Sequence, residues 1–150
     1  MKHFIGFNFT QNAFWYCVTS YEEGSSQVVE SKKTLIPDKE CSELMDWFET
    51  NFHQIFEKFS ISKAGFNVAI PTTHIQIDRA TYPKAILNLI CFKRNIEIEG
   101  FSTTRISLRN LKVKSELELY TYLDNTYGKH SPAWNNNARE ALGVALLIIS

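Results

Sequence analysis

His74 and Asp78 lie four residues apart, a spacing that lets an imidazole and a carboxylate pair on one face of a helix. Such a pair could exchange protons with a substrate, but no nucleophile accompanies it at a recognisable spacing. Both residues follow the apolar run 66–70, which we interpret as a strand. Because ligands of open α/β sheets bind beyond the carboxyl ends of strands, the two residues lie where a ligand site is expected. The alternative interpretation is that Asp78 caps a helix beginning near Arg79, which requires no ligand.

Two clusters of hydroxyl side chains in the same region suit a phosphate group. Thr72 and Thr73 follow the first of two neighbouring predicted strands, and Ser102, Thr103 and Thr104 follow the second. Hydroxyl groups and free backbone amides at a helix start can hold a phosphate. The same residues also cap helices without any ligand, so both interpretations stay open.

Four basic residues form a run with no acid between them. They are Arg105, Arg109, Lys112 and Lys114, and Lys129 and His130 could extend the run. Guanidinium and ammonium groups in such a run can follow the phosphates of a nucleic acid. The alternative is an ordinary solvated face of the protein.

Trp134 lies in a predicted loop, next to Asn135 and close to Pro132. An exposed indole in this place could stack on a nucleic-acid base or anchor a protein partner. The alternative is that the ring covers an edge of the core, which is the more common role of a tryptophan.

The composition predicts one folded domain, residues 1–150. Hydrophobic residues make up 44% of the chain, which is enough to build a core and argues against disorder. Sixteen basic residues balance sixteen acidic residues, so the net charge gives no global attraction to nucleic acid or to anionic membranes. The three cysteines include no CxxC pair, which argues against a zinc site or a disulfide framework.

The chain contains no segment that predicts export or membrane insertion. Residues 1–9 lack a basic segment followed by a long apolar run. The longest apolar stretch, Ala141–Ile149, is shorter than the roughly 20 residues that span a bilayer. We therefore expect a cytoplasmic protein that does not contact membranes.

Glycine-rich nucleotide loops, zinc-protease motifs and nucleophile elbows are also missing from the sequence.

Apolar periodicity predicts the elements that must position these side chains. Alternating or short apolar runs predict five strands, at His3–Phe9, Ala13–Thr19, Gln27–Leu35, Phe66–Ile70 and Ile96–Gly100. Spacings of three and four residues predict helices at Lys39–Phe59, Tyr82–Phe92, Ser115–Tyr122 and Ala138–Ile149, with a loop at Asn125–Asn137. We therefore expect an α/β fold with a mixed five-stranded sheet and flanking helices. His3–Phe9 should be central and parallel to Phe66–Ile70, and Gln27–Leu35 should be an antiparallel edge.

Four segments carry a resemblance to a known superfamily. Phe4-Ile5-Gly6-Phe7-Asn8 and Gly65–Ile70 with Pro71 are similar to its first and fourth strands, which end in Asp and Glu. Residues 96–106 are similar to its fifth strand and the following loop, and Asn136–Ala145 is similar to its last helix, which begins with acids. Together with the element order β-β-β-α-β-α-β-α, these segments resemble the RNase H-like superfamily, in its RuvC-like branch of Holliday-junction resolvases. The chain also resembles small bacterial proteins placed in this superfamily.

The departures from that pattern concern the acids. Enzymes of this superfamily use two Mg²⁺ ions, and several carboxylates are needed to hold them. Asn8, Pro71, Asn136 and Asn137 stand at the corresponding positions of this chain, which weakens any metal site. Glu140 is the acid that remains near the expected site, and its alternative role is that of a solvated helix residue.

The resemblance with its missing acids implies a catalytically inactive domain that binds nucleic acid or a protein partner and needs no cofactor. The candidate binding residues are Arg105, Arg109, Lys112, Lys114, Thr72, Thr73 and Trp134. A first alternative is a divergent nuclease that binds Mg²⁺ through Asn8, His74, Asp78 and Glu140. A second alternative is a structural or dimerising protein. Resolvases of this type are dimers, so the resemblance also implies a homodimer.

Overall fold

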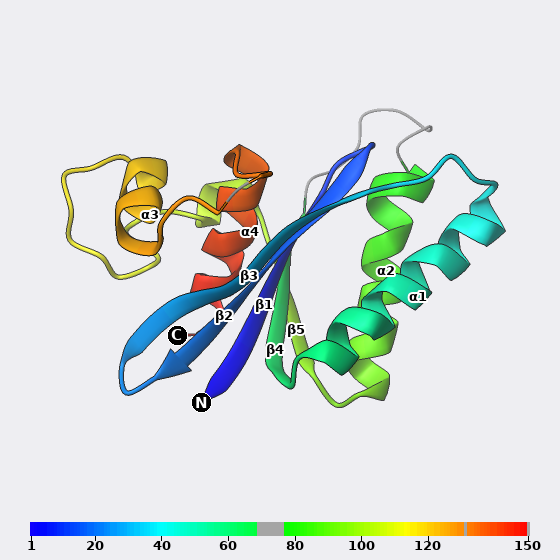
Figure 1. The fold of residues 1–150 in the computed structure, drawn as a ribbon, viewed down its shortest axis with the longest axis horizontal. Coiled ribbons are helices and arrows are strands. Elements are labelled where there is room, and N and C mark those ends of the chain that lie inside the picture. Colours follow the sequence, from blue (N-terminus) through cyan, green and yellow to red (C-terminus); the bar gives the residue numbers. More distant parts are fainter. Residues whose placement is uncertain (69–76, 131, 150) are drawn as a thin grey trace.

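The structure is a computed structural model that describes residues 1–68, 77–130 and 132–149. Its centre is a mixed five-stranded sheet in the order β3-β2-β1-β4-β5, with helices on both faces (Figure 1). The strands are β1 (Lys2–Phe9), β2 (Ala13–Glu22), β3 (Ser25–Leu35), β4 (Ile61–Asn67) and β5 (Glu97–Phe101). The helices are α1 (Cys41–Lys58), α2 (Tyr82–Lys93), α3 (Leu119–Tyr127) and α4 (Asn136–Leu147), with a π-helix η2 (Ile77–Thr81) and a 3-10 helix η3 (Thr103–Arg105).

The pairing of the strands confirms the predicted topology. β1 is central, antiparallel to β2 on one side and parallel to β4 on the other. β3 is the antiparallel edge beside β2, and β5 is the opposite edge, parallel to β4. The carboxyl ends of β1, β4 and β5 therefore meet at one end of the sheet.

The sheet separates two hydrophobic layers, since α1 and α2 cover one face and α4 covers the other, with α3 on its outer side (Figure 1). Alternate side chains of β1 point to opposite faces, as the pleat requires. Ile5, Phe7 and Phe9 enter the aromatic core beneath α1, where the rings of Phe7 and Phe52 lie 5.6 Å apart. The residues between them face α4, so β1 is buried on both sides.

Glycines let α4 lie directly on the backbone of β1 and β4. A Cβ atom on Gly6 would lie only 2.1 Å from the carbonyl oxygen of Ala141, and one on Gly65 would lie 2.7 Å from Cγ1 of Val144. Any side chain at either position would push the helix away from the sheet. This close approach brings the first turn of α4 within reach of Asn8, two residues beyond Gly6.

The boundaries of α1, α2 and α4 fall within about two residues of their predicted positions, a difference that assignment methods also show. The fourth strand differs more, because it begins at Ile61 rather than Phe66 and ends at Asn67. The polar residues Ser62 and Lys63 near its start hide it from a search for apolar runs. Of the predicted strand Phe66–Ile70, residues 69 and 70 lie outside the described residues.

The third helix is also displaced from its prediction. It spans Leu119–Tyr127 rather than Ser115–Tyr122, so the predicted loop Asn125–Asn137 is wrong for its first residues. Asn125 and Thr126 have a low helix propensity. The burial of Leu123 and the packing of Tyr127 against the hydrophobic cluster between α4 and β2 outweigh it. The helix ends at Gly128, whose φ of 85° suits glycine.

Asp78 lies in the π-helix η2, and Thr81 is the N-cap of α2, so the expected capping role of Asp78 is wrong. Pro71, Thr72, Thr73 and His74 lie outside the described residues. Within the described ranges, no helix combines the length and the apolar character that a membrane crossing requires.

Candidate functional site

Asn8 lies at the carboxyl end of the central strand and is only 3% exposed. Its side chain points toward the first turn of α4, which carries Asn137 and Glu140. The start of α4 is fixed by Asn135, whose side-chain oxygen accepts a hydrogen bond of 3.1 Å from the backbone N–H of Ala138. Because asparagine is a favoured N-cap residue, the sequence itself sets where this turn begins.

The side-chain amide of Asn8 donates hydrogen bonds to two residues of α4. Its Nδ2 lies 2.9 Å from Oδ1 of Asn137 and 3.1 Å from Oε2 of Glu140. An amide carries two N–H donors on Nδ2, so these two acceptors use both. The reverse orientation of the amide would set its oxygen against two other acceptors and would be repulsive. We call Asn8, Asn137 and Glu140 the amide cluster.

The second oxygen of Glu140 is also occupied. The hydroxyl of Tyr120 in α3 donates a hydrogen bond of 3.1 Å to Oε1 of Glu140. Burial raises the pKa of Tyr120, and the neighbouring charge of Glu140 raises it further, so the phenol stays protonated and remains a donor. Both oxygens of the one carboxylate in the cluster are therefore bound by donors from the protein.

Asn67 is a second asparagine at the same end of the sheet, and the sequence analysis missed it. The register pairs Phe7 with Phe66, so Asn67 follows at the level of Asn8. Asn67 is 2% exposed, and its Nδ2 lies 3.1 Å from the hydroxyl oxygen of Thr103. The resemblance directed attention to Pro71, but the strand ends at Asn67. The repeated triplet Gly-Phe-Asn, at residues 6–8 and 65–67, could have revealed it.

An ion pair fixes α3 against α4 beside the amide cluster. The guanidinium of Arg139 donates to both carboxylate oxygens of Asp124, at 2.9 and 2.8 Å, and to Oδ1 of Asn136 at 3.0 Å. The indole N–H of Trp134 donates to Oδ1 of Asp124 at 2.7 Å. Arg139 holds the pKa of Asp124 below its ordinary value, with the Trp134 bond adding to the effect. Bidentate geometry makes this pair a rigid support for the first turn of α4.

Solved structures with this arrangement of sheet and helices include Holliday junction resolvases. RuvC from T. thermophilus, in complex with a Holliday junction substrate, matches with a TM-score of 0.78 at 9% identity, over 98% of this chain and 92% of that one. The yeast mitochondrial resolvase Ydc2 matches with a TM-score of 0.67 at 16% identity, over 97% and 76% of the two chains. The fowlpox virus resolvase matches with a TM-score of 0.66 at 6% identity, over 98% and 97%.

The chain has the RuvC-like RNase H fold. This confirms the fold class expected from the element order. At these identities the likeness concerns the fold alone. No protein-family model matches the chain, and no curated protein matches it by sequence.

On this RuvC-like fold, the residues at the carboxyl ends of β1 and β4 do not fit a pair of Mg²⁺ ions. Mg²⁺ prefers carboxylate and water oxygens, and two ions need several negative charges. The amide cluster offers one carboxylate, Glu140, and Asn67 adds another neutral amide. The part of the chain that the structure describes contains no group of three or more His, Cys, Asp or Glu able to hold a metal.

The structure places Asp78 away from the amide cluster. The π-helix η2 packs against α1 and α2, in the layer across the sheet from α4 (Figure 1). Asp78 lines a cavity of about 630 Å³ there, together with Asp38 and Tyr82. Its neighbour Arg79 donates hydrogen bonds of 2.6 to 3.0 Å to the carbonyls of Gln11, Ile36 and Pro37, which is a structural role.

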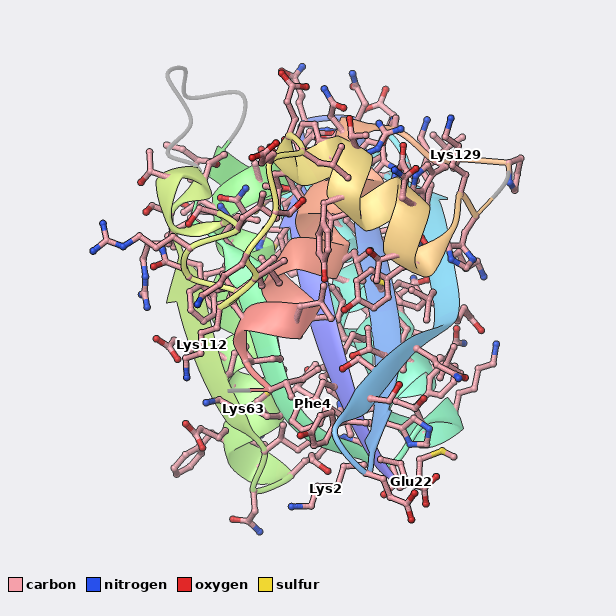
Figure 2. All side chains as sticks on the ribbon, turned by 90° about the vertical axis from the view of Figure 1, so that its left-hand side faces the viewer. Lys2, Phe4, Glu22, Lys63, Lys112 and Lys129 are labelled. Atoms are coloured by element: carbon pink, nitrogen blue, oxygen red, sulfur yellow. The ribbon has the colours of Figure 1, made fainter. Side chains whose placement is uncertain are left out.

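The predicted basic run lies on the exposed loop between β5 and α3. Arg105 lies over the ring of Phe101, 4.6 Å from its centroid, and 3.6 Å from a carboxylate oxygen of Glu99. Arg109, Lys112 and Lys114 are exposed and form no ion pair with any described residue. In Figure 2, which looks at the face with α3 and α4, Lys112 and Lys129 lie at opposite sides. Lys129 therefore does not extend the run.

Trp134 and the hydroxyl cluster at residues 102–104 make contacts within the protein. Trp134 is half-buried, packs against the cluster beneath α3 and α4, and meets His130 edge-on at 5.2 Å, which agrees with a ring that covers a core edge. Thr103 bonds Asn67, and the hydroxyl oxygens of Ser102 and Thr104 lie 3.1 Å apart. Ser102 lies at the N-cap position of η3, as one of the two interpretations expects, but its side chain makes no capping hydrogen bond.

Proposed function

We propose that this chain is a nucleic-acid-binding domain of RuvC-like fold that does not cleave its ligand. The observation that carries the proposal is the bond from Asn8 to Glu140. In a metal-dependent nuclease the carboxylates converge on cations. Here the acceptors Asn137 and Glu140 converge instead on the side-chain N–H groups of Asn8. These groups carry only partial positive charges, whereas a metal-dependent nuclease holds metal cations at this place.

The amide cluster also opposes metal entry through its own bonds. A cation at this place requires Asn8 to rotate its oxygen toward Glu140, which breaks its bonds to Asn137 and Glu140. The Tyr120 bond would compete for the same carboxylate. A buried network in which each member is satisfied resists partial rearrangement, because each broken bond leaves a polar group without a partner.

Nucleic acid is the ligand that the surroundings of the cluster favour. The basic run Arg105, Arg109, Lys112 and Lys114 follows β5, whose carboxyl end lies beside that of β4. Solved structures with this fold include resolvases in complex with Holliday junction DNA, from T. thermophilus and from fowlpox virus. A four-way DNA junction is therefore the first probe to use. A protein partner is the alternative ligand class, and the cytoplasmic location and bacterial source expected from the sequence remain predictions.

Fluorescence anisotropy with a labelled four-way junction and a duplex of equal length tests the binding. We expect saturable binding at low salt, tighter for the junction. Lys112→Glu should weaken binding by about tenfold if two charge units at one phosphate contact are lost. Lys39→Glu, the matched reversal of an exposed lysine near the start of α1, should leave binding unchanged. Absence of wild-type binding to either DNA would overturn the proposal and favour a protein partner or a structural role.

A further inference from the structure

A cavity of about 230 Å³ lies on the face of the sheet that α3 and α4 cover. It is formed where the end of α4 meets the β2–β3 hairpin, α3 and the loop between β5 and α3, whereas the amide cluster lies at the start of α4. The described residues that line it are half-buried, and none of them is charged. They include Tyr21, Tyr122, Tyr127, Leu111, Val113 and Leu146. Since a protein cavity of roughly 150 Å³ can hold benzene, this one has room for one or two fused rings.

Three tyrosines form the aromatic part of the cavity wall. Tyr21 comes from β2, and Tyr122 and Tyr127 come from α3. Burial raises the pKa of Tyr127 to about 12, and Tyr122, with which it shares a hydrogen bond, adds to the effect. The phenol therefore stays neutral at pH 7. Aromatic rings pack favourably against one another, so this wall suits a flat aromatic ring.

The rim of the cavity is basic on the side of the loop between β5 and α3. Leu111 and Val113 line the cavity and alternate with Lys112 and Lys114, which are exposed and form no ion pair with any described residue. The backbone N–H of Leu111 donates a hydrogen bond of 2.9 Å to the carbonyl of Ser107, which holds this turn of the loop. The backbone that carries both lysines is therefore fixed at the edge of the cavity.

The acid next to Tyr21 in the sequence points away from the cavity. Successive side chains of a strand point to opposite faces, so Glu22 faces away from the wall that Tyr21 forms. Its carboxylate lies 3.8 Å from the amino group of Met1. Figure 2 looks onto the face with α3 and α4 and shows Lys112 at the left and Glu22 at the bottom. An anionic group beside Lys112 therefore meets positive charge.

We propose that this cavity binds a small aromatic molecule that carries an anionic group. The aromatic ring packs against the tyrosines of β2 and α3, and the anionic group points out of the cavity toward Lys112 and Lys114. The apolar wall supplies most of the contact area, and the charged rim determines which ligands are preferred. The inference does not depend on nucleic-acid binding, so a four-way junction that fails to bind leaves it intact.

Three probes with the same ring and different charges test the cavity by isothermal titration calorimetry. We expect indole-3-acetate to bind with a dissociation constant on the order of 100 µM, as befits a ligand of this small size. Neutral indole should bind about fivefold more weakly, because it lacks one exposed charge contact, and cationic tryptamine more weakly still. Wild type that binds none of the three at millimolar concentration would overturn the proposal. Equal affinities for indole-3-acetate and tryptamine would do the same.

A variant of the wall tests whether the tyrosines hold the ring. Tyr122→Ala should weaken the binding of indole and indole-3-acetate alike, by about tenfold. Tyr82→Ala is the matched control, because Tyr82 is an exposed tyrosine of α2 on the other face of the sheet, and it should bind like wild type. Thermal unfolding verifies that both variants are folded. Equal affinities of wild type and Tyr122→Ala would contradict the proposal.

The amide NMR spectrum of wild type locates the ligand without any variant. Saturating indole-3-acetate should shift the signals of Leu111 and Val113 and leave those of α2 unchanged. Shifts confined to α2 would contradict the proposal.

A double variant of the rim tests the position of the anionic group. Lys112→Gln with Lys114→Gln should reduce the affinity for indole-3-acetate to that for indole and leave the affinity for indole unchanged. The control is Lys39→Gln with Lys93→Gln, two exposed lysines near the start of α1 and at the end of α2, which should keep the difference between the probes. A preference for indole-3-acetate that survives the loss of both rim lysines would overturn the assignment of the anionic group to this rim.

Discussion

The side-chain nitrogen of Asn8 lies 3.1 Å from a carboxylate oxygen of Glu140, although the two residues are 132 positions apart in the chain. One stands at the end of the first strand and the other in the first turn of the last helix. The contact therefore joins the two ends of the sequence at the carboxyl end of the sheet. It also determines which chemistry is available there, because an amide donor faces the one carboxylate.

Replacing this donor with an acid should cost stability and create a response to metal. In Asn8→Asp a buried carboxylate would face Glu140, and we expect a loss of about 3–5 kcal/mol at pH 7. The loss should shrink as the pH falls and one of the two acids takes up a proton. Millimolar Mg²⁺ should raise the melting temperature of this variant but not that of wild type.

Asn51→Asp is the control for that prediction, because Asn51 bonds the backbone carbonyl of Trp47 in α1, away from the amide cluster. It should show no response to Mg²⁺. Calorimetry with and without the ion measures both variants. An Asn8→Asp protein as stable as wild type would contradict the donor role of Asn8.

The glycine contact beneath α4 should be intolerant of any side chain. Gly6→Ala places a methyl group 2.1 Å from the Ala141 oxygen. Because the helix must be displaced, we expect the free energy of unfolding to fall by about 3 kcal/mol. Gly24→Ala is the comparison, because nothing lies within 4 Å and only its φ of +82° opposes alanine. That change should cost about 1–2 kcal/mol. Urea unfolding compares the two, and an equal loss would argue against the close packing of α4 on β1.

The ion pair between Arg139 and Asp124 should make stability depend on acid pH. The folded-state pKa of Asp124 lies below its ordinary value of 3.8, so the pair stabilises the protein above that value. The contribution should be lost as the pH falls below about 3.8 toward the folded-state pKa. The two side chains are 17% and 13% exposed, so their attraction is only partly screened by solvent.

Asp124→Asn should lower the free energy of unfolding by about 1.5–3 kcal/mol near neutral pH and flatten its dependence on acid pH. Asp46→Asn, at an exposed position of α1, should change neither quantity. Urea unfolding between pH 2.5 and 7 provides the comparison. An unchanged acid slope in Asp124→Asn would mean that the ion pair contributes nothing to folding.

The basic run should give nucleic-acid binding a steep dependence on salt. Each phosphate contact contributes about 0.9 to the slope of log affinity against log salt on duplex DNA. Arg105→Ala with Arg109→Ala should reduce the slope by about two contacts, and the paired control Lys39→Ala with Lys129→Ala should not. Stability should change little, because exposed charges contribute about 0–1 kcal/mol each. Equal slopes in all three proteins would place the contact on another surface.

The sequence predicted the strands and helices whose apolar periodicity is strong. It did not predict the site residues whose position depends on an exact strand end or on the packing of two helices. Gly6 and Asn8 were identified correctly as the end of a central strand, because apolar residues surround them. Asn67 was missed, since the polar start of β4 shifted the predicted strand past it. Tyr120 lay within the helix predicted at Ser115–Tyr122, with no role assigned to its hydroxyl. Its bond to Glu140 depends on how α3 packs on α4, which no local pattern encodes.

Asp78 shows a different limit of the sequence analysis. The sequence analysis placed a ligand site after the fourth strand, because ligands of open α/β sheets bind beyond the carboxyl ends of strands. The order of residues does not reveal on which face of the sheet the chain continues. The structure places Asp78 in the layer of α1 and α2, and Glu140 on the opposite face. Two acids that looked like partners are therefore separated by the sheet.

The most direct test of the account is a single-turnover cleavage assay on a labelled four-way junction, with protein in excess and with Mg²⁺ or Mn²⁺ present. We predict that the junction is bound, as measured in the same mixture by anisotropy, and remains intact in both ions. Glu140→Gln should behave like wild type, since the carboxylate holds no metal. Cleavage by wild type that disappears in Glu140→Gln would contradict the account and show that Glu140 binds a catalytic ion despite its bond to Asn8.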